Sequence, residues 1–246
     1  MRSIFVSIIG YTFLALMCTV FLILSAVAFV VCYPFDPKRR VVHNLTRAMV
    51  YIFFTCFWWM WGYEILGREN ADPKKRYVIV MNHNAMMDVP MLYFLALDFR
   101  WVSKRQVFSI PFFGQLLVLH GDIAIERGNP AESMKKVMKQ GLEWISRGVS
   151  VSIFPEGTRS KTGEIGRFKS GAFRLAKEAE VDILPVVVQG TRTLLTSKGM
   201  LNPKSKITIK VLPSVPAQRV VDTEMKELME EVREEMVIAL AQMNKV

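Results

Sequence analysis

Residues 77–90 have the sequence YVIVMNHNAMMDVP, and this stretch decides the fold class. The apolar run 77–81 is short and rich in β-branched residues, which is typical of a buried strand. Asp88 stands directly before Val89 and Pro90, where it suits the start of a helix. The stretch therefore predicts a strand, a turn and a helix in succession, which is the repeating unit of an α/β fold.

The same alternation continues along the chain. Further apolar runs that we predict as strands lie at 99–103, 123–125, 149–154, 183–188 and 207–211. Between the runs at 123–125 and 149–154, Asn129 and Pro130 mark the start of a helix. Residues 168–180 and the stretch from Met225 have the spacing of amphipathic helices. We expect a central sheet, mostly parallel or mixed, flanked by helices, with functional residues at strand ends and in the loops that follow.

Residues 3–35 contain no charged side chain. As a helix this run would be about 50 Å long, against a hydrocarbon core of about 30 Å. We predict a helical membrane anchor. A cleavable signal peptide is the alternative, and the length of the run argues against it. The basic cluster at 38–40 belongs on the cytoplasmic side by the positive-inside rule, so we expect the main domain in the cytoplasm.

A second uncharged run, 48–63, is dense in aromatic residues. A helix over this run would be only about 24 Å long, too short to span a bilayer comfortably. We predict that it lies in or dips into the cytoplasmic leaflet. The alternative is a buried helix that packs against the main domain. The chain thus divides into membrane-associated helices at 1–65 and an α/β domain at 66–246.

The composition favours an anionic and apolar environment. The formal net charge is +10 and the hydrophobic fraction is 51%, which points to membrane lipids or an acidic carrier protein as partners. Nucleic acid is disfavoured, since no helix-turn-helix, zinc-finger or RNA-recognition signature is present. The three cysteines, Cys18, Cys32 and Cys56, lie in the apolar N-terminal region without metal-binding spacing. The rest of the chain therefore has no cysteine to serve as a nucleophile.

One of the three histidines, His83, follows the strand at 77–81 directly. The intervening loop can fold the Asp88 carboxylate back toward its imidazole. Such a pair is the working unit of general-base catalysis, because the carboxylate fixes the tautomer while the other ring nitrogen accepts a proton. The alternative is a structural histidine with an aspartate that only caps the helix.

The sequence FPEGTRS at 154–160 also follows an apolar run and is succeeded by further basic residues and glycines. Arg159 offers a planar fork for phosphate, and glycine lets the backbone approach a ligand closely. We interpret the loop as a site for a phosphorylated substrate; an ordinary solvated turn is the alternative. It is not a Walker loop, and Gly-x-Ser-x-Gly does not occur in the chain, which disfavours an acyl-serine mechanism.

Four segments in this order resemble the motifs of the glycerolipid acyltransferase family, whose first motif is His-x4-Asp. They are His83 with Asp88, GDIAIER at 121–127, FPEGTR at 154–159 and ILPV at 183–186. Lys104 and PFFG at 111–114 add to the likeness, which covers roughly 66–215 and is greatest to the bacterial 1-acyl-sn-glycerol-3-phosphate acyltransferases. The second motif departs mildly, with Glu126 before the retained Arg127.

The resemblance implies that His83 removes the proton of an acceptor hydroxyl and that Asp88 orients His83. The acceptor would be the sn-2 hydroxyl of lysophosphatidic acid, and the donor acyl-CoA or acyl carrier protein, giving phosphatidic acid without a further cofactor or a metal. The location implied is the bacterial inner membrane, with the catalytic domain on its cytoplasmic face. The substrate-binding residues implied are Arg127, Arg159, Lys104, Glu156, Gly157 and Thr158, and the acyl-channel residues are Leu184, Pro185 and Val186.

Two other readings of the sequence stay open at this point. One keeps the chemistry and changes the acceptor to another lysophospholipid, a lyso-ornithine lipid or glycerol-3-phosphate. The other is a non-catalytic protein that binds lipid surfaces. Such a binding protein has no physical use for a poised base beside a phosphate loop, so His83 and Arg159 argue against it.

Overall fold

The computed structural model describes residues 2–57, 61–126, 128–202 and 205–244. Within these ranges the chain forms a seven-stranded sheet in the order β1-β7-β6-β2-β5-β3-β4. The strands are β1 (Trp61–Leu66), β2 (Tyr77–Met81), β3 (Phe99–Lys104), β4 (Ile123–Ile125), β5 (Ser150–Ile153), β6 (Asp182–Gln189) and β7 (Ser205–Val211). Neighbouring strands are parallel except β6 and β7, which are antiparallel. The predicted α/β fold with a mixed sheet is confirmed.

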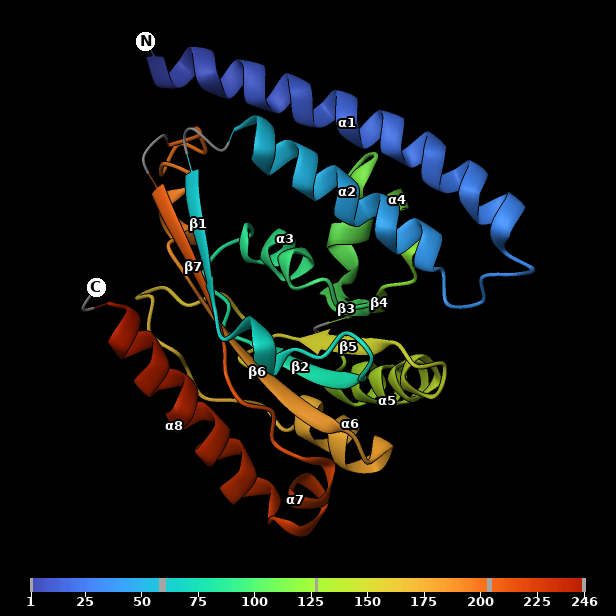
Figure 1. Ribbon diagram of the computed structural model, residues 1–246, viewed down its shortest axis with the longest axis vertical. Helices are drawn as coiled ribbons and strands as arrows, with labels where there is room; N and C mark the ends of the chain where they lie inside the picture. Colours follow the sequence, from blue (N-terminus) through green and yellow to red (C-terminus); the bar gives the residue numbers. More distant parts are fainter. Residues whose placement is uncertain (1, 58–60, 127, 203–204, 245–246) are drawn as a thin grey trace.

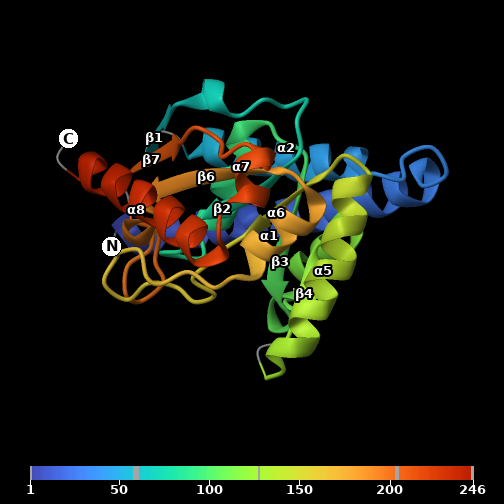
Figure 2. The ribbon, with the colours of Figure 1, turned by 90° about the horizontal axis from the view of Figure 1, so that it is seen from below.

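Helices cover both faces of this sheet (Figure 1, Figure 2). They are α1 (Arg2–Cys32), α2 (Arg40–Cys56), α3 (Asp88–Met91), α4 (Phe113–His120), α5 (Pro130–Ser146), α6 (Gly171–Ala179), α7 (Ala217–Asp222) and α8 (Met225–Met243). Single 3-10 turns are η1 (Arg68–Asn70), η2 (Leu92–Leu95), η3 (Arg105–Ser109) and η4 (Thr191–Thr193). Helices α1 to α4 lie on one side of the sheet, and α5 to α8 lie on the other (Figure 1).

Strand β2 is the part of the sheet that positions the candidate site. Each of its five residues is at most 1% exposed. Because side chains alternate across a strand, Val78 and Val80 join the apolar cluster beneath α5, α6 and α8. Tyr77, Ile79 and Met81 join the cluster beneath α2 and α3. The carboxyl end of β2, where His83 follows, is therefore held between two packed layers.

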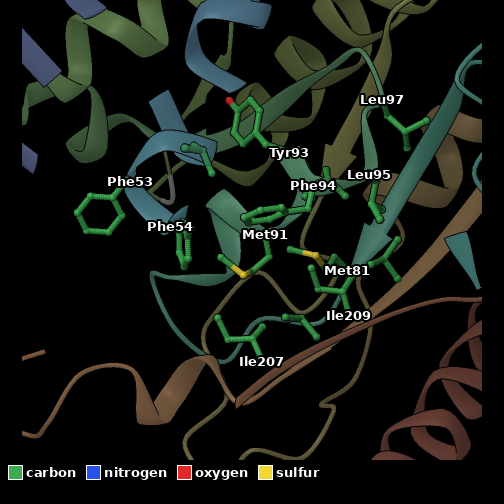
Figure 3. Packing of buried hydrophobic residues seen from close by; sticks show 14 of the residues in the cluster. Phe53, Phe54, Met81, Met91, Tyr93, Phe94, Leu95, Leu97, Ile207 and Ile209 are labelled. Atoms are coloured by element: carbon green, nitrogen blue, oxygen red, sulfur yellow. The ribbon is translucent and has the colours of Figure 1, made fainter. Parts of the chain in front are cut away.

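The helix predicted over 48–63 is wrong in its extent. Helix α2 begins at Arg40 and ends at Cys56, and Trp61 already starts β1, which pairs in parallel with β7. The aromatic run concealed this change from helix to strand because both states accept aromatic residues. One face of α2 is buried against the domain, and Phe54 lies against Phe94 with ring centroids 5.5 Å apart (Figure 3). This packing matches the alternative stated above, a buried helix that packs against the main domain.

Helix α1 lies along α2 and also contacts α4 (Figure 1). Its segment Ile4–Cys32 is long and apolar enough to cross a membrane, judged by length and composition. Many of its large apolar side chains are exposed, among them Phe5 at 66% and Val30 at 74%. Apolar surface of this extent on a water-facing helix is unfavourable, which indicates that the helix associates with a membrane.

A buried polar chain joins α2 to the end of α4. His43 Nδ1 lies 2.8 Å from His120 Nε2, and His120 Nδ1 lies 2.8 Å from Asp122 Oδ1. The other nitrogen of His43 contacts the Leu97 carbonyl oxygen at 2.9 Å. Burial lowers the pKa of both imidazoles, and for His43 the charges of His120 and Arg100 lower it further. These histidines belong to the fold rather than to the site around His83.

Stability should depend on pH through His43. Its pKa is lowered in the native state and returns to about 6.5 on unfolding, so below that value the unfolded chain binds the additional proton. The stabilisation is complete above about pH 6.5 and is lost as the pH falls below it. The melting temperature in detergent should decrease as the pH is lowered from about 7.5 to about 5.5. In His43→Gln this decrease should be smaller. Equal slopes for the two proteins would contradict this account.

Candidate active site

His83 and Asp88 meet in the turn between β2 and α3. His83 Nδ1 lies 2.9 Å from Asp88 Oδ2, as the sequence predicts for the pair. The carboxylate is fully buried, and the same oxygen accepts the backbone N–H of Asn84 at 2.6 Å and of Ala85 at 2.7 Å. Asp88 therefore folds back over its own loop instead of capping α3. Three hydrogen-bond donors therefore converge on this one oxygen.

The imidazole plane is fixed by stacking. The rings of His83 and Phe154 are 3.9 Å apart between centroids and 17° from parallel. Phe154 stacks in turn on Trp101 of β3 at 4.9 Å and 16°. The His83 side chain keeps 17% exposure, and no described residue is hydrogen-bonded to its Nε2. A ring held in this way, with Nδ1 bound to a carboxylate, leaves Nε2 available to accept a proton.

The loop after β5 is fastened to the backbone of His83 on both sides. Glu156, 8% exposed, accepts the His83 N–H through Oε1 at 2.9 Å and the Gly166 N–H through Oε2 at 3.0 Å. The Ser160 N–H donates to the His83 carbonyl at 2.7 Å. Gly157 has a φ of 69°, a left-handed conformation that favours glycine. The first and third predicted motifs thus form one structural unit.

A pocket of about 360 Å³ opens on this loop. Its lining residues are Glu156, Thr158, Arg159, Ser160, Lys161, Thr162, Glu164, Ile165, Gly166 and Arg167. Arg159, Lys161 and Arg167 are exposed there and outnumber the exposed Glu164. The excess positive charge suits an anionic group such as a phosphate.

The remaining predicted residues have different positions. Leu184, Pro185 and Val186 are buried in β6 and pair in parallel with β2; their role in an acyl channel stays a prediction. Lys104 ends β3 and is half-buried. Arg127 lies outside the described residues. In the described part of the chain, no group of three or more His, Cys, Asp or Glu side chains is placed to hold a metal ion.

Sequence reasoning missed two polar residues beside the pair. The Thr191 hydroxyl, on the turn after β6, donates to Asp88 Oδ1. The Asn82 side-chain amide accepts from the Val188 N–H at 2.7 Å and donates to the Val188 carbonyl at 3.0 Å. A signal was available, since both residues are polar and follow neighbouring parallel strands, whose carboxyl ends meet at one edge of the sheet.

Comparison with known proteins identifies the family of this chain. The model of the acyltransferase family matches residues 63–189, and the chain belongs to this family. It is 36% identical to the 1-acyl-sn-glycerol-3-phosphate acyltransferase of Pseudomonas aeruginosa over 68% of this chain and 67% of that protein. It is 34% identical to the chloroplastic 1-acyl-sn-glycerol-3-phosphate acyltransferase of Arabidopsis thaliana over 68% of this chain and 47% of that protein. The chain thus spans about half the length of the plant relatives it matches.

The fold is also shared with a solved structure. The crystal structure of the 1-acyl-sn-glycerophosphate (LPA) acyltransferase PlsC from Thermotoga maritima superposes with a TM-score of 0.79. The match covers 99% of this chain and 98% of that one at 21% sequence identity. The likeness therefore extends over the N-terminal helices as well as the sheet.

The Glu156 bridge should contribute measurably to stability. Glu156→Gln replaces one acceptor oxygen by an amide that faces a backbone N–H, and loss of a charged hydrogen bond costs about 1.5–3 kcal/mol. We expect a lower free energy of unfolding and faster hydrogen exchange at the amides of His83 and Gly166. Glu164→Gln, an exposed change in the same loop, is the control and should stay within about 0.5 kcal/mol. Similar results for both variants would rule out the bridge.

Proposed function

We propose that this protein is a 1-acyl-sn-glycerol-3-phosphate O-acyltransferase. It moves an acyl group from the thioester of acyl-CoA or acyl carrier protein to the sn-2 hydroxyl of lysophosphatidic acid, and the product is phosphatidic acid. The observation that carries the proposal is the His83 imidazole, bound at Nδ1 to a buried carboxylate and open at Nε2. Family membership and the names of the relatives support the same reaction.

The proposed reaction proceeds in two steps. His83 Nε2 takes the proton of the sn-2 hydroxyl as its oxygen attacks the thioester carbonyl carbon, and the ionised Asp88 stabilises the imidazolium that forms. The tetrahedral intermediate then collapses, the carbon–sulfur bond breaks, and the thiolate takes the proton from the imidazolium. The products are phosphatidic acid and a free thiol, and His83 is again neutral. A thioester is an activated donor, so no acyl-enzyme is required.

The loop at 154–167 is the proposed site of the acceptor phosphate. Arg159 offers two parallel N–H donors, with Lys161 and Arg167 lining the same pocket. Glu156 and Gly157 shape this loop, with Thr158 in its wall. Arg127 and Lys104 are proposed as further phosphate contacts, and Leu184, Pro185 and Val186 as neighbours of the acyl chain, on the resemblance of the motifs.

Within the predicted membrane-associated part at 1–65, helices α1 and α2 are proposed to hold the α/β domain, whose sheet includes β1 from Trp61, at the cytoplasmic face of a bacterial inner membrane. The exposed apolar side chains of α1 supply the lipid contact. Helices α1 and α2 form a hairpin that lies along the domain (Figure 1), an arrangement suited to entry into one leaflet. Arg40 forms an ion pair with Asp98 at 3.0 Å, and this pair ties the start of α2 to the residue that precedes β3.

The first experiment measures phosphatidic acid formation by the detergent-solubilised protein from lysophosphatidic acid and each acyl thioester. His83→Ala should lose at least about a hundredfold in kcat at equal folded concentration, because a positioned base contributes about 10²- to 10⁴-fold. Other lysophospholipids and glycerol-3-phosphate are assayed in parallel. Preference for one of these would replace the acceptor, and full activity of His83→Ala would remove the mechanism.

Arg159 is tested by separating the two Michaelis constants. Arg159→Ala should raise the KM for lysophosphatidic acid by about 10- to 100-fold, because two hydrogen bonds between charged groups are lost. The KM for the acyl donor should stay within about twofold of the wild-type value. Arg159→Lys should lie between, since it keeps the charge but not the fork. Arg76→Ala is the control, because Arg76 is exposed at the opposite end of β2. Equal rises in both constants would disprove the phosphate contact.

A further inference from the structure

The Asp88 carboxylate receives hydrogen bonds from two directions. Oδ2 is held by His83 and by the N–H groups of its own loop, all within five residues in the sequence. Oδ1 is bound by Thr191, 103 residues away. Among the described residues Thr191 is the one hydrogen-bond partner of Oδ1, and its side chain is 1% exposed. Because both residues are buried, bulk water is not positioned to donate a hydrogen bond to Oδ1 in place of Thr191.

The position of Thr191 is set by its surroundings with little freedom. Asn82 follows the last residue of β2, and its side-chain amide forms hydrogen bonds with both the N–H and the carbonyl of Val188, as a strand backbone would. Gly190 then turns the chain with a φ of 87°, and a Cβ there would lie 1.9 Å from the Lys206 carbonyl oxygen. The turn η4 follows at once and presents the Thr191 hydroxyl to Asp88. The end of β6 is thus built against the loop of His83.

We propose that Thr191 is a positioning residue that keeps the Asp88 carboxylate ionised and oriented, and thereby keeps the proton of His83 on Nδ1 and Nε2 free. This inference rests on the proposed function, and it adds a third member to the His83–Asp88 pair. A hydroxyl that donates to a carboxylate stabilises its charged form. Without that donor Asp88 Oδ1 is buried and unpaired, and the pair binds a proton more tightly.

The charged side chains on the neighbouring elements, Glu156, Lys169 and Arg192, have contacts that do not involve the Thr191 hydroxyl. Glu156 accepts the His83 N–H from the loop after β5. Lys169 lies beside Gly157, with its Nζ 3.0 Å from where a Cβ would be. Arg192, next to Thr191, donates to the Lys161 carbonyl at 2.8 Å. A shift in the titration of His83 on loss of the Thr191 hydroxyl therefore reports on that hydroxyl.

The test compares Thr191→Val and Thr191→Ala, which lack the hydroxyl, with Thr191→Ser, which keeps it. The first two should lose about 10- to 100-fold in kcat, with both KM values within about twofold, since the lost bond is to a charged group. The acid limb of their kcat profile should move up by about half to one pH unit, because a pair without this donor holds its proton more tightly. Thr191→Ser should stay within about threefold of the wild type, with an unmoved limb.

A second readout needs no substrate. Nitrogen-15 NMR of histidine-labelled protein in detergent follows the His83 ring, assigned by its absence in His83→Gln, and its midpoint should rise in the Val and Ala variants by the same amount. An unmoved midpoint in the folded Val or Ala variant overturns the proposal, even where wild type makes no phosphatidic acid and the proposed function itself fails. Wild-type kcat in both variants, or a loss in Thr191→Ser equal to theirs, also overturns it.

Discussion

The structure depends on satisfying one buried carboxylate, that of Asp88. Burying an unpaired carboxylate is costly, and the protein offsets that cost with hydrogen-bond donors from the loop after β2 and from the turn after β6. The Asn82 amide also ties β2 to β6 beyond their paired residues. Once the carboxylate is fixed, the tautomer and the direction of the His83 ring follow.

Strand β3 connects this carboxylate to the membrane side of the molecule. Trp101 stacks on Phe154, which stacks on His83, while the backbone N–H of Trp101 donates to Asp122 Oδ1 at 2.7 Å. Asp122 in turn ends the buried chain of His120 and His43, which reaches helix α2. The hairpin of α1 and α2 is therefore joined to the site through packed rings and buried hydrogen bonds. His83, at the end of β2, thus keeps a defined position relative to α1 and α2.

The two loops of the site carry different chemical groups. The loop after β2 carries the proposed base and its carboxylate, whereas the loop after β5 carries the cationic side chains of the pocket. Glu156 and Ser160 fasten one loop to the backbone of the other, so the spacing between His83 and the pocket is set by contacts to backbone groups. In the proposed function, the long cationic side chains of the pocket remain solvated and adjust to a headgroup without disturbing His83.

The sequence alone determined the α/β class, the strand and turn at 77–90 and the pairing of His83 with Asp88, because these follow from short-range patterns and a five-residue separation. It did not determine that Trp61–Leu66 is a strand, since that strand exists only by pairing with β7. Nor did it determine the contacts of Thr191 and Asn82, whose partners lie 103 and 106 residues away. Such contacts depend on strand order, and strand order is decided by how the apolar faces of distant elements are buried together.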